Sequence, residues 1–207
     1  LAKVDPGEAF RASPERLARM KKILDELEKT GERIQELGKG QLAGIFKIDE
    51  KYKSVVFVVD RSGSMSSNQA LERVKAEMTY GISQLKPEQS FGVVFFDDKF
   101  YMMGTQFSLL KATPANAKQV EAWMQQIHPG GGTTPYPAMQ VALNANPELI
   151  VLLSDGEFGP FNVQQITQNN QAKRDKKCRI DCIGLGEVIV TLHDIAKQNG
   201  GVYKMAR

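Results

Sequence analysis

Two uninterrupted apolar segments constrain the fold of this chain more than any other feature of its sequence. They run from Val55 to Val59 and from Leu149 to Leu153. A strand with one solvated face alternates apolar and polar residues, whereas a strand covered on both faces is apolar throughout, as in a parallel sheet. The two segments therefore predict central strands of a sheet that carries helices on both faces.

Segments with helical periodicity alternate with these apolar strands. The expected helices cover about residues 68–85, 113–127, 136–144, 161–173 and 191–198. The expected strands are residues 54–60, 91–96, 148–154, 179–184 and 202–205, with a turn at 97–99 that leads into an antiparallel strand at 100–103. Because strand–helix alternation is typical of right-handed crossovers, the sequence predicts an α/β fold with a doubly wound, mostly parallel sheet, one antiparallel edge strand and helices on both faces.

An amphipathic helix is expected near the start of the chain, over residues 14–38. It begins at the capping pair Ser13-Pro14 and is interrupted at Gly31. Its apolar positions follow spacings of three and four residues: Leu17, Met20, Leu24, Leu27, Ile34 and Leu37. Such a stripe fits a helix packed on the domain, and it also fits a coiled-coil or linker helix that joins upstream sequence.

Length and charge limit the classes of protein to which the chain can belong. Its 207 residues suit one medium domain at residues 51–207, preceded by a helical extension or linker at 1–50. A net charge of +3 argues against nucleic acid as a partner. No apolar stretch reaches the roughly 20 residues that span a bilayer. Because the chain begins at Leu1, we expect a fragment of a longer protein, so membrane association is expected only through upstream sequence and the compartment stays open.

A polar pattern follows the first apolar segment. Asp60, Ser62 and Ser64 alternate where the strand leaves the sheet, and Gly63 lets the backbone bend closely there. Their oxygens can converge on one side of the turn, at the carboxyl end of a strand, where ligands of such sheets bind. Carboxylate and hydroxyl oxygens are the ligands that hard cations prefer. The pattern predicts a cation site, although a capped turn is the ordinary alternative for these residue types.

Two later segments complete the predicted site. Thr133 follows a run of glycines that can approach the site without steric cost, and Asp155 follows the second apolar segment. Asp155 can bind the cation directly or through a water. Two carboxylates and three hydroxyls roughly neutralise a divalent ion and leave positions for water or a ligand. The expected cofactor is Mg²⁺, with Mn²⁺ or Ca²⁺ as alternatives, and an acidic group from outside suits the open positions.

Three patterns in this order resemble a von Willebrand factor A-type domain over about residues 53–206: Asp60-x-Ser62-x-Ser64, Gly131-Gly132-Thr133 and Ser154-Asp155-Gly156. The resemblance implies a metal-ion-dependent adhesion site, at which a protein partner contributes an acidic side chain to a bound Mg²⁺. Residue by residue, it implies these ligands: Asp60, Ser62, Ser64, Thr133 and Asp155. Thr134, the next residue along the chain, is the alternative threonine.

The expected function is therefore protein binding, in adhesion or in complex assembly, without catalysis. A magnesium-dependent phosphohydrolase on a similar sheet is the enzymatic alternative, but the motifs carry no acid-x-acid nucleophile pattern and no suitably placed lysine. A docking subunit of an ATPase complex is another alternative. Ser62 or Ser64 could act as a nucleophile only with a histidine brought in by the fold, and His128 and His193 are expected at the surface.

Further acidic residues near the motifs are expected to be solvated. Asp97 and Asp98 form the predicted hairpin turn, where a second cation site is the less favoured alternative. Glu157 is expected to be an exposed loop acid that could tune the site electrostatically.

Overall fold

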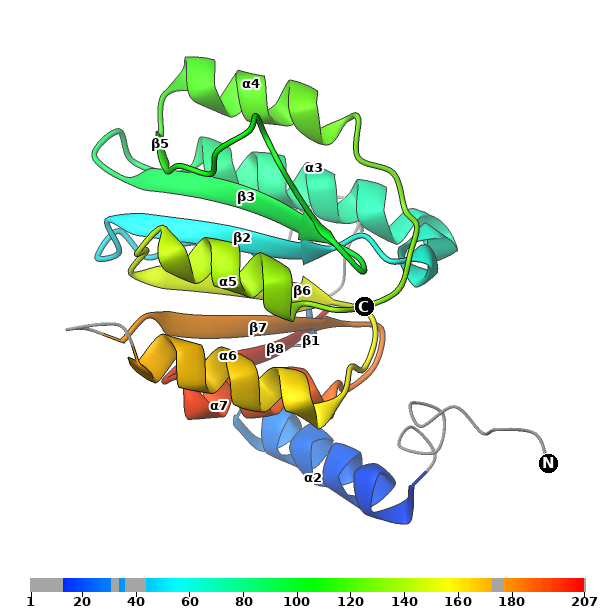
Figure 1. The fold of residues 1–207 in the computed structure, drawn as a ribbon. Coiled ribbons are helices and arrows are strands. Elements are labelled where there is room, and N and C mark those ends of the chain that lie inside the picture. Colours follow the sequence, from blue (N-terminus) through cyan, green and yellow to red (C-terminus); the bar gives the residue numbers. More distant parts are fainter. Residues whose placement is uncertain (1–12, 31–33, 36–43, 173–176, 207) are drawn as a thin grey trace.

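The computed structural model describes residues 13–30, 34–35, 44–172 and 177–206, and these residues form one eight-stranded sheet (Figure 1). The strand order is β1-β8-β7-β6-β2-β3-β4, with β5 paired to β3. The strands are β1 Ile34–Gln35, β2 Ser54–Asp60, β3 Ser90–Phe96, β4 Phe100–Met102, β5 Leu110–Lys111, β6 Leu149–Ser154, β7 Arg179–Leu185 and β8 Tyr203–Ala206. The helices are α2 Pro14–Thr30, η1 Gly63–Gln69, α3 Ala70–Ser83, α4 Pro114–Met124, α5 Tyr136–Asn144, α6 Pro160–Ala172 and α7 Val190–Gln198.

The two apolar segments form the centre of the sheet, as the sequence predicts. Strand β2 pairs in parallel with β3 on one side and with β6 on the other. The pairing of β3 with β4 is antiparallel, which supplies the expected edge strand. The predicted fold class is therefore confirmed. Strand β5 adds a short second antiparallel pairing that the sequence pattern did not indicate.

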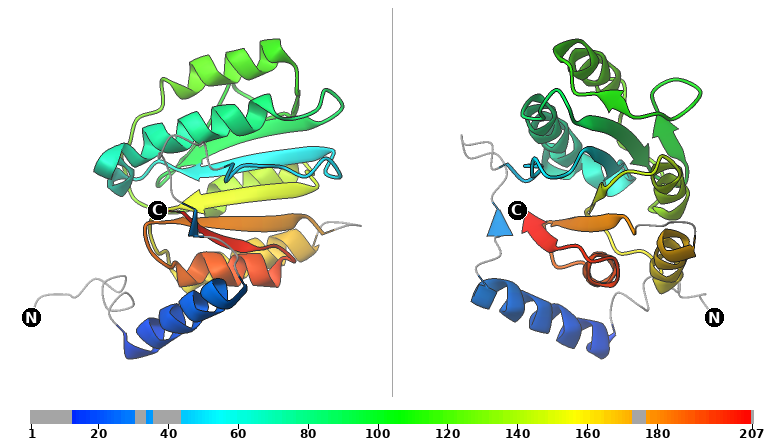
Figure 2. Two further views of the ribbon diagram at one scale, coloured as in Figure 1. Left: turned by 180° about the vertical axis from the view of Figure 1, so that it is seen from behind. Right: turned by 90° about the vertical axis from the view of Figure 1, so that its left-hand side faces the viewer.

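Helices cover both faces of the sheet (Figures 1 and 2), and each face has its own hydrophobic core. On β2, Val56 and Val58 face the core under α5, α6 and α7, whereas Phe57 and Val59 face the core under α3 and α4. This period of two follows from the pleat of a strand. Because both faces are covered, β2 is buried almost throughout, and its carboxyl end is fixed firmly at the edge where Asp60 lies.

Helix α2 is shorter than predicted. It ends at Thr30, and Ile34–Gln35 form β1, which pairs in parallel with β8 in the register Ile34 to Met205. The prediction of helix at Ile34 is therefore wrong, because this segment instead satisfies the backbone groups along the edge of β8. The predicted position Leu37 lies outside the described residues, and the proposed division at residues 50 and 51 stays a prediction.

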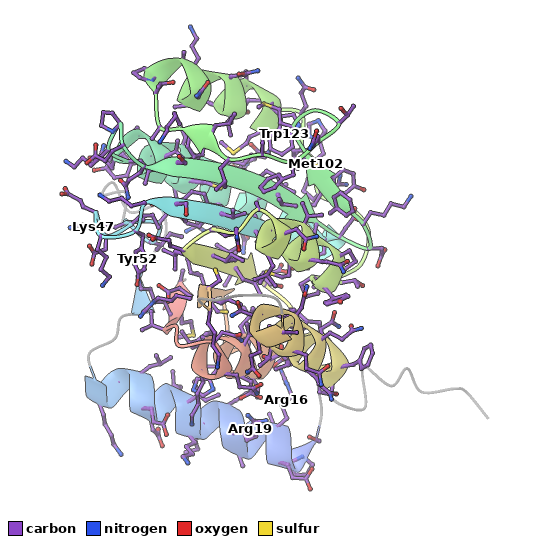
Figure 3. The ribbon with its side chains drawn as sticks, turned by 60° about the vertical axis from the view of Figure 1, so that its left-hand side comes forward. Arg16, Arg19, Lys47, Tyr52, Met102 and Trp123 are labelled. Atoms are coloured by element: carbon purple, nitrogen blue, oxygen red, sulfur yellow. The ribbon has the colours of Figure 1, made fainter. Side chains whose placement is uncertain are left out.

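Helix α2 packs on α7, in agreement with the first of the two alternatives for this helix. Ile23 and Leu27 are buried in the core that α7 shares, but Leu17 is 56% exposed. The prediction that Leu17 belongs to the buried stripe is wrong. In this turn Arg16 points inward instead; it is buried and forms an ion pair with Glu157. Figure 3 labels Arg16 and Arg19 on this helix.

Among the described residues, no helix combines the length and the apolar character that crossing a bilayer requires.

Candidate metal centre

Asp60 forms the buried base of the candidate site. It ends β2, and its side chain is fully buried. The Ser62 amide donates to its Oδ1 at 2.7 Å, and the Ser154 hydroxyl donates to its Oδ2. Ser154 closes the adjacent strand β6. Ser154 was not among the five predicted ligands, although it stands directly before Asp155 in the sequence.

Hydrogen bonds connect Asp60 to the second carboxylate across the sheet. The hydroxyls of Ser62 and Ser64 lie 3.1 Å apart, and the Ser64 hydroxyl donates to Asp155 Oδ1 at 2.8 Å. Parallel pairing of β2 with β6 brings together residues 91 positions apart in the sequence. Four of the five predicted ligands therefore form one hydrogen-bonded chain, which runs from the buried Asp60 to the partly exposed Asp155.

Thr133 reaches the same region from the glycine loop. The Gly63 amide donates to the Gly131 carbonyl at 3.1 Å, which ties this loop to the turn after β2. The Thr133 hydroxyl oxygen lies 3.8 Å from the point where a β-carbon on Gly156 would sit. The backbone amide of Thr134, by contrast, donates to the carbonyl of Asp97 at 2.9 Å. Thr133 thus adjoins the Asp155 turn, and the backbone of Thr134 is held on the side of the β3–β4 hairpin.

The β3–β4 hairpin supports the glycine loop. Asp97 is buried, accepts from the Tyr101 hydroxyl at 2.9 Å and lies 3.5 Å from Nε of Arg61. The exposed Asp98 accepts from the Gly132 amide at 2.8 Å. The expectation of a solvated turn is therefore wrong for Asp97. The fold places this carboxylate beside the guanidinium of Arg61. Arg61 stands within the D-x-S-x-S pattern, and nothing in that pattern indicated a contact with Asp97.

Glu157 is also buried, in contrast to the expected exposed loop acid. It accepts from the Val190 amide at 2.7 Å and from the Thr191 hydroxyl at 2.6 Å, at the first turn of α7. Amides at a helix N-terminus attract an anion, and Arg16 of α2 pairs with the same carboxylate. Contacts with residues distant in the sequence therefore compensate the cost of burying the Glu157 carboxylate.

The electrostatic environment of Asp60 disfavours its own charge. Burial, with a further contribution from the nearby charge of Asp155, raises the pKa of Asp60 from 3.8 to about 6. Hydrogen bonds from Ser154 and Ser62 oppose this shift. Among the described residues, no ion pair involves Asp60. A cation at this point would stabilise the ionised carboxylate.

The donor chemistry fits a hard divalent cation. Among the described residues, no group of three or more His, Cys, Asp or Glu side chains could hold a metal ion. The five predicted ligands differ from such a cluster, because only two of them are carboxylates and the other three are hydroxyls. All five coordinate through oxygen. Mg²⁺ usually takes one or two carboxylates and keeps several waters, which matches this set. The role of these five residues as metal ligands stays a prediction.

A match to a family model agrees with this arrangement. The model of the von Willebrand factor type A domain matches residues 55–157, from β2 to the loop after β6. This chain belongs to the von Willebrand factor type A domain family. Domains of this family typically mediate protein–protein interactions.

Curated relatives of this domain are much longer proteins. Human inter-alpha-trypsin inhibitor heavy chain H4 is 28% identical over 169 residues, which cover 72% of this chain and 18% of that protein. Inter-alpha-trypsin inhibitor heavy chain H2 of Mesocricetus auratus is 28% identical over 154 residues, which cover 67% and 16%. The chain therefore spans less than a fifth of the length of these relatives.

Solved structures share the fold. A von Willebrand factor type A protein from Catenulispora acidiphila has a TM-score of 0.66 at 22% identity, over 75% of this chain and 38% of that one. Proximal thread matrix protein 1 from the mussel byssus has a TM-score of 0.57 at 22% identity, over 74% and 41%. At these identities, the likeness concerns the fold alone.

A groove of about 520 Å³ lies beside the candidate metal centre of the von Willebrand factor A domain. Ser64 and Asp155 line it together with Arg73 of α3, and Leu185 and Glu187 line it from the end of β7. The groove thus continues the candidate site across the surface, with charged side chains of both signs and an apolar contribution from Leu185.

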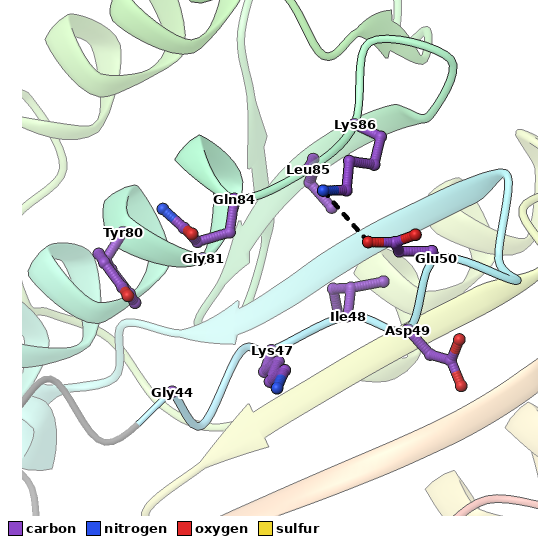
Figure 4. A pocket seen from close by; sticks show the side chains of 10 residues that line it. All are labelled: Gly44, Lys47, Ile48, Asp49, Glu50, Tyr80, Gly81, Gln84, Leu85 and Lys86. Atoms are coloured by element: carbon purple, nitrogen blue, oxygen red, sulfur yellow. Dashed lines mark ion pairs between the residues drawn. The ribbon is translucent and has the colours of Figure 1, made fainter.

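A separate cavity of about 650 Å³ lies at the other end of α3 (Figure 4). Its lining includes Tyr80, Glu50 and Lys86, and Nζ of Lys86 lies 3.1 Å from Oε1 of Glu50. None of the five predicted ligands lines this cavity. The length of helix α3 separates this cavity from the groove beside the candidate metal centre.

Proposed function

We propose that this von Willebrand factor A domain binds a protein partner through a divalent cation, Mg²⁺ in the first instance. The five predicted ligands would hold the cation, and a carboxylate of the partner would complete its shell. The observation that carries the proposal is the hydrogen-bonded chain from Asp60 through Ser62 and Ser64 to Asp155. It presents oxygen donors from two strands at the carboxyl edge of the sheet, where α/β proteins bind ligands.

Coordination chemistry supports a carboxylate as the partner's contribution. Three of the five predicted ligands are neutral hydroxyls, the open positions of a hard cation prefer oxygen ligands, and a carboxylate is the strongest oxygen ligand among protein side chains. Mn²⁺ and Ca²⁺ also prefer oxygen ligands and are alternatives to Mg²⁺. Selectivity among partners would then come from the groove beside Ser64 and Asp155.

A peptide pair tests the proposed carboxylate contact. We expect a short peptide with a single aspartate to perturb the amide NMR signals of Ser64 and Thr133 when Mg²⁺ is present. The same peptide should have no such effect in EDTA, and its asparagine counterpart should have none in either condition. Equal perturbation by the two peptides, or binding that is indifferent to EDTA, would contradict the proposed mode of binding.

We further propose that the domain has no catalytic activity of its own. The Ser64 hydroxyl donates to Asp155, a proposed metal ligand. Of the two histidines, His193 packs against Tyr203 and lies beside Asp194, and His128 is exposed. Among the described residues, no histidine is hydrogen-bonded to Ser62 or Ser64 as a general base would be. No particular described residue favours the phosphohydrolase or ATPase-docking alternatives.

Purified protein is accordingly expected to leave generic phosphate esters and peptides unchanged in the presence of Mg²⁺. The measurement is product release under multiple-turnover conditions, with Asp60→Ala as the comparison. Turnover that follows the protein through purification and disappears in Asp60→Ala would establish an enzyme instead.

A further inference from the structure

Arg16 of α2 joins the two loops that border the candidate metal centre. The first is the Asp155 loop, residues 155–159 between β6 and α6, and the second is the turn between β7 and α7. Nε and Nη2 of Arg16 both lie 3.3 Å from Oε1 of Glu157, in the Asp155 loop. Nη2 also lies 3.8 Å from Oε1 of Glu187, which lines the groove.

The contact between Arg16 and Glu157 is buried and has many partners. The two side chains are only 7% and 2% exposed. Beyond Arg16, the Glu157 carboxylate accepts from the Val190 amide at 2.7 Å, the Thr191 amide at 3.3 Å and the Thr191 hydroxyl at 2.6 Å. Glu157 therefore fixes three elements to one another: α2, α7 and the loop that begins with Asp155.

The rest of α2 contributes a much simpler attachment. Ile23 and Leu27 pack on the core, and Nη2 of Arg19 binds both oxygens of Asp194 on α7 at 2.6 and 2.8 Å. The Arg19 side chain is 52% exposed. Arg19 thus joins α2 to α7, whereas Arg16 forms ion pairs with Glu157 in the Asp155 loop and with Glu187 in the turn before α7.

We propose that α2 is a positioning element for the candidate metal centre and acts through the contact of Arg16 with Glu157. Glu157 lies two residues beyond Asp155, so the anchored carboxylate restricts where Asp155 can place its own oxygens. Displacement of α2 would release Glu157 and weaken cation binding. Conversely, a bound cation would hold α2 more firmly on the domain, because coupling between two sites is reciprocal. This inference rests on the proposed function, since it concerns the same cation.

Mg²⁺ titration of the full chain tests the coupling, with Arg19→Ala as the matched control. Arg16→Ala is expected to weaken Mg²⁺ binding by about tenfold, at the lower end of the effects of residues that orient metal ligands. Arg19→Ala removes an ion pair of the same helix and should change the dissociation constant by less than about twofold, since the ion pair of Arg19 is with Asp194 and not with the Asp155 loop. Arg16→Lys should recover part of the affinity because it keeps the charge. Calorimetry is performed well below the melting temperature of each variant.

Hydrogen exchange provides a readout that needs no metal. In EDTA, Arg16→Ala should speed exchange of the amides in the Asp155 loop, whereas Arg19→Ala should not. In Mg²⁺, exchange within α2 should slow for the unmodified protein and change less for Arg16→Ala. If Arg16→Ala does not fold, Glu157→Gln provides the same comparison, because it removes the ion pair and keeps an acceptor for α7.

The outcomes separate the two proposals. If unmodified protein binds no divalent cation, the proposed function fails, and exchange of the Asp155 loop in EDTA still decides whether α2 positions it. If unmodified protein binds Mg²⁺ and Arg16→Ala binds it equally well, the positioning role is wrong. Equal weakening by Arg16→Ala and Arg19→Ala would also overturn it, because α2 would then act only through general packing.

Discussion

Magnesium at about 10 mM is expected to raise the melting temperature of the unmodified protein by about 3–11 °C. A site with two carboxylates and three hydroxyls should bind with a dissociation constant of about 0.1–1 mM, near the weak end for hard-cation sites. A ligand that binds only the folded state then adds about 1.4–2.7 kcal/mol to the free energy of unfolding. For a domain of this size, each kcal/mol corresponds to about 2–4 °C.

Two substitutions assign this shift to the candidate site. Asp60→Ala should remove most of it, because the hydroxyls and Asp155 alone cannot offset the dehydration of the ion. Thr133→Ala should reduce it less, since water can replace one neutral ligand. Melting curves are recorded with Mg²⁺, Mn²⁺ and Ca²⁺, each against EDTA. A melting temperature of the unmodified protein that is indifferent to all three ions would refute the metal site.

Asp60→Asn is expected to stabilise the protein when no cation is present. At about pH 7, the ionised and buried Asp60 costs folding free energy, because its pKa is about 6 in the folded state against 3.8 ordinarily. A shift of about two units corresponds to about 3 kcal/mol, at about 1.36 kcal/mol for each unit. Asparagine removes the charge and keeps an acceptor for the Ser62 amide. The Ser154 hydroxyl also lies 3.2 Å from the Gly156 carbonyl, to which it can donate instead.

The dependence on pH has a definite sign. The folded state binds the Asp60 proton more tightly than the unfolded state, so the cost from Asp60 is present above about pH 6 and is relieved as the pH falls towards about 4. Urea unfolding in EDTA should therefore show a contribution from Asp60 that raises the free energy of unfolding as the pH falls over this range in the unmodified protein, and no such contribution in Asp60→Asn. In Mg²⁺ the unmodified protein should be the more stable of the two, since aspartate can ionise and bind the ion, whereas asparagine carries no charge. An Asp60→Asn variant that is less stable than the unmodified protein in EDTA at about pH 7 would contradict this account.

The two expectations have one physical origin. An anionic side chain kept away from water is costly without a cation and is a strong ligand with one. The hydrogen bonds of Ser62 and Ser154 orient the Asp60 carboxylate without neutralising it. The proposed binding site therefore reduces the stability of the cation-free domain, and cation binding recovers it.

The sequence by itself determined the central strands, the alternation with helices and the edge where the site lies. These features are encoded locally: the run from Val55 to Val59 is apolar because both faces are covered, and Asp60 follows where the strand ends. The carboxyl ends of neighbouring parallel strands lie at one edge, so the proximity of Asp60 and Asp155 could be predicted without coordinates.

Only the tertiary structure decided which residues surround these strands. The contact of Arg16 with Glu157 joins residues 141 positions apart, and no local periodicity encodes it. A charged residue is expected to be exposed unless its partner is known, so the periodicity placed Leu17 inward where the structure has Arg16, and Glu157 was expected to be exposed. A charged side chain can be buried only where residues distant in the sequence compensate its charge. The burial of an apolar strand follows from its local residue pattern, which is visible in the sequence without the fold.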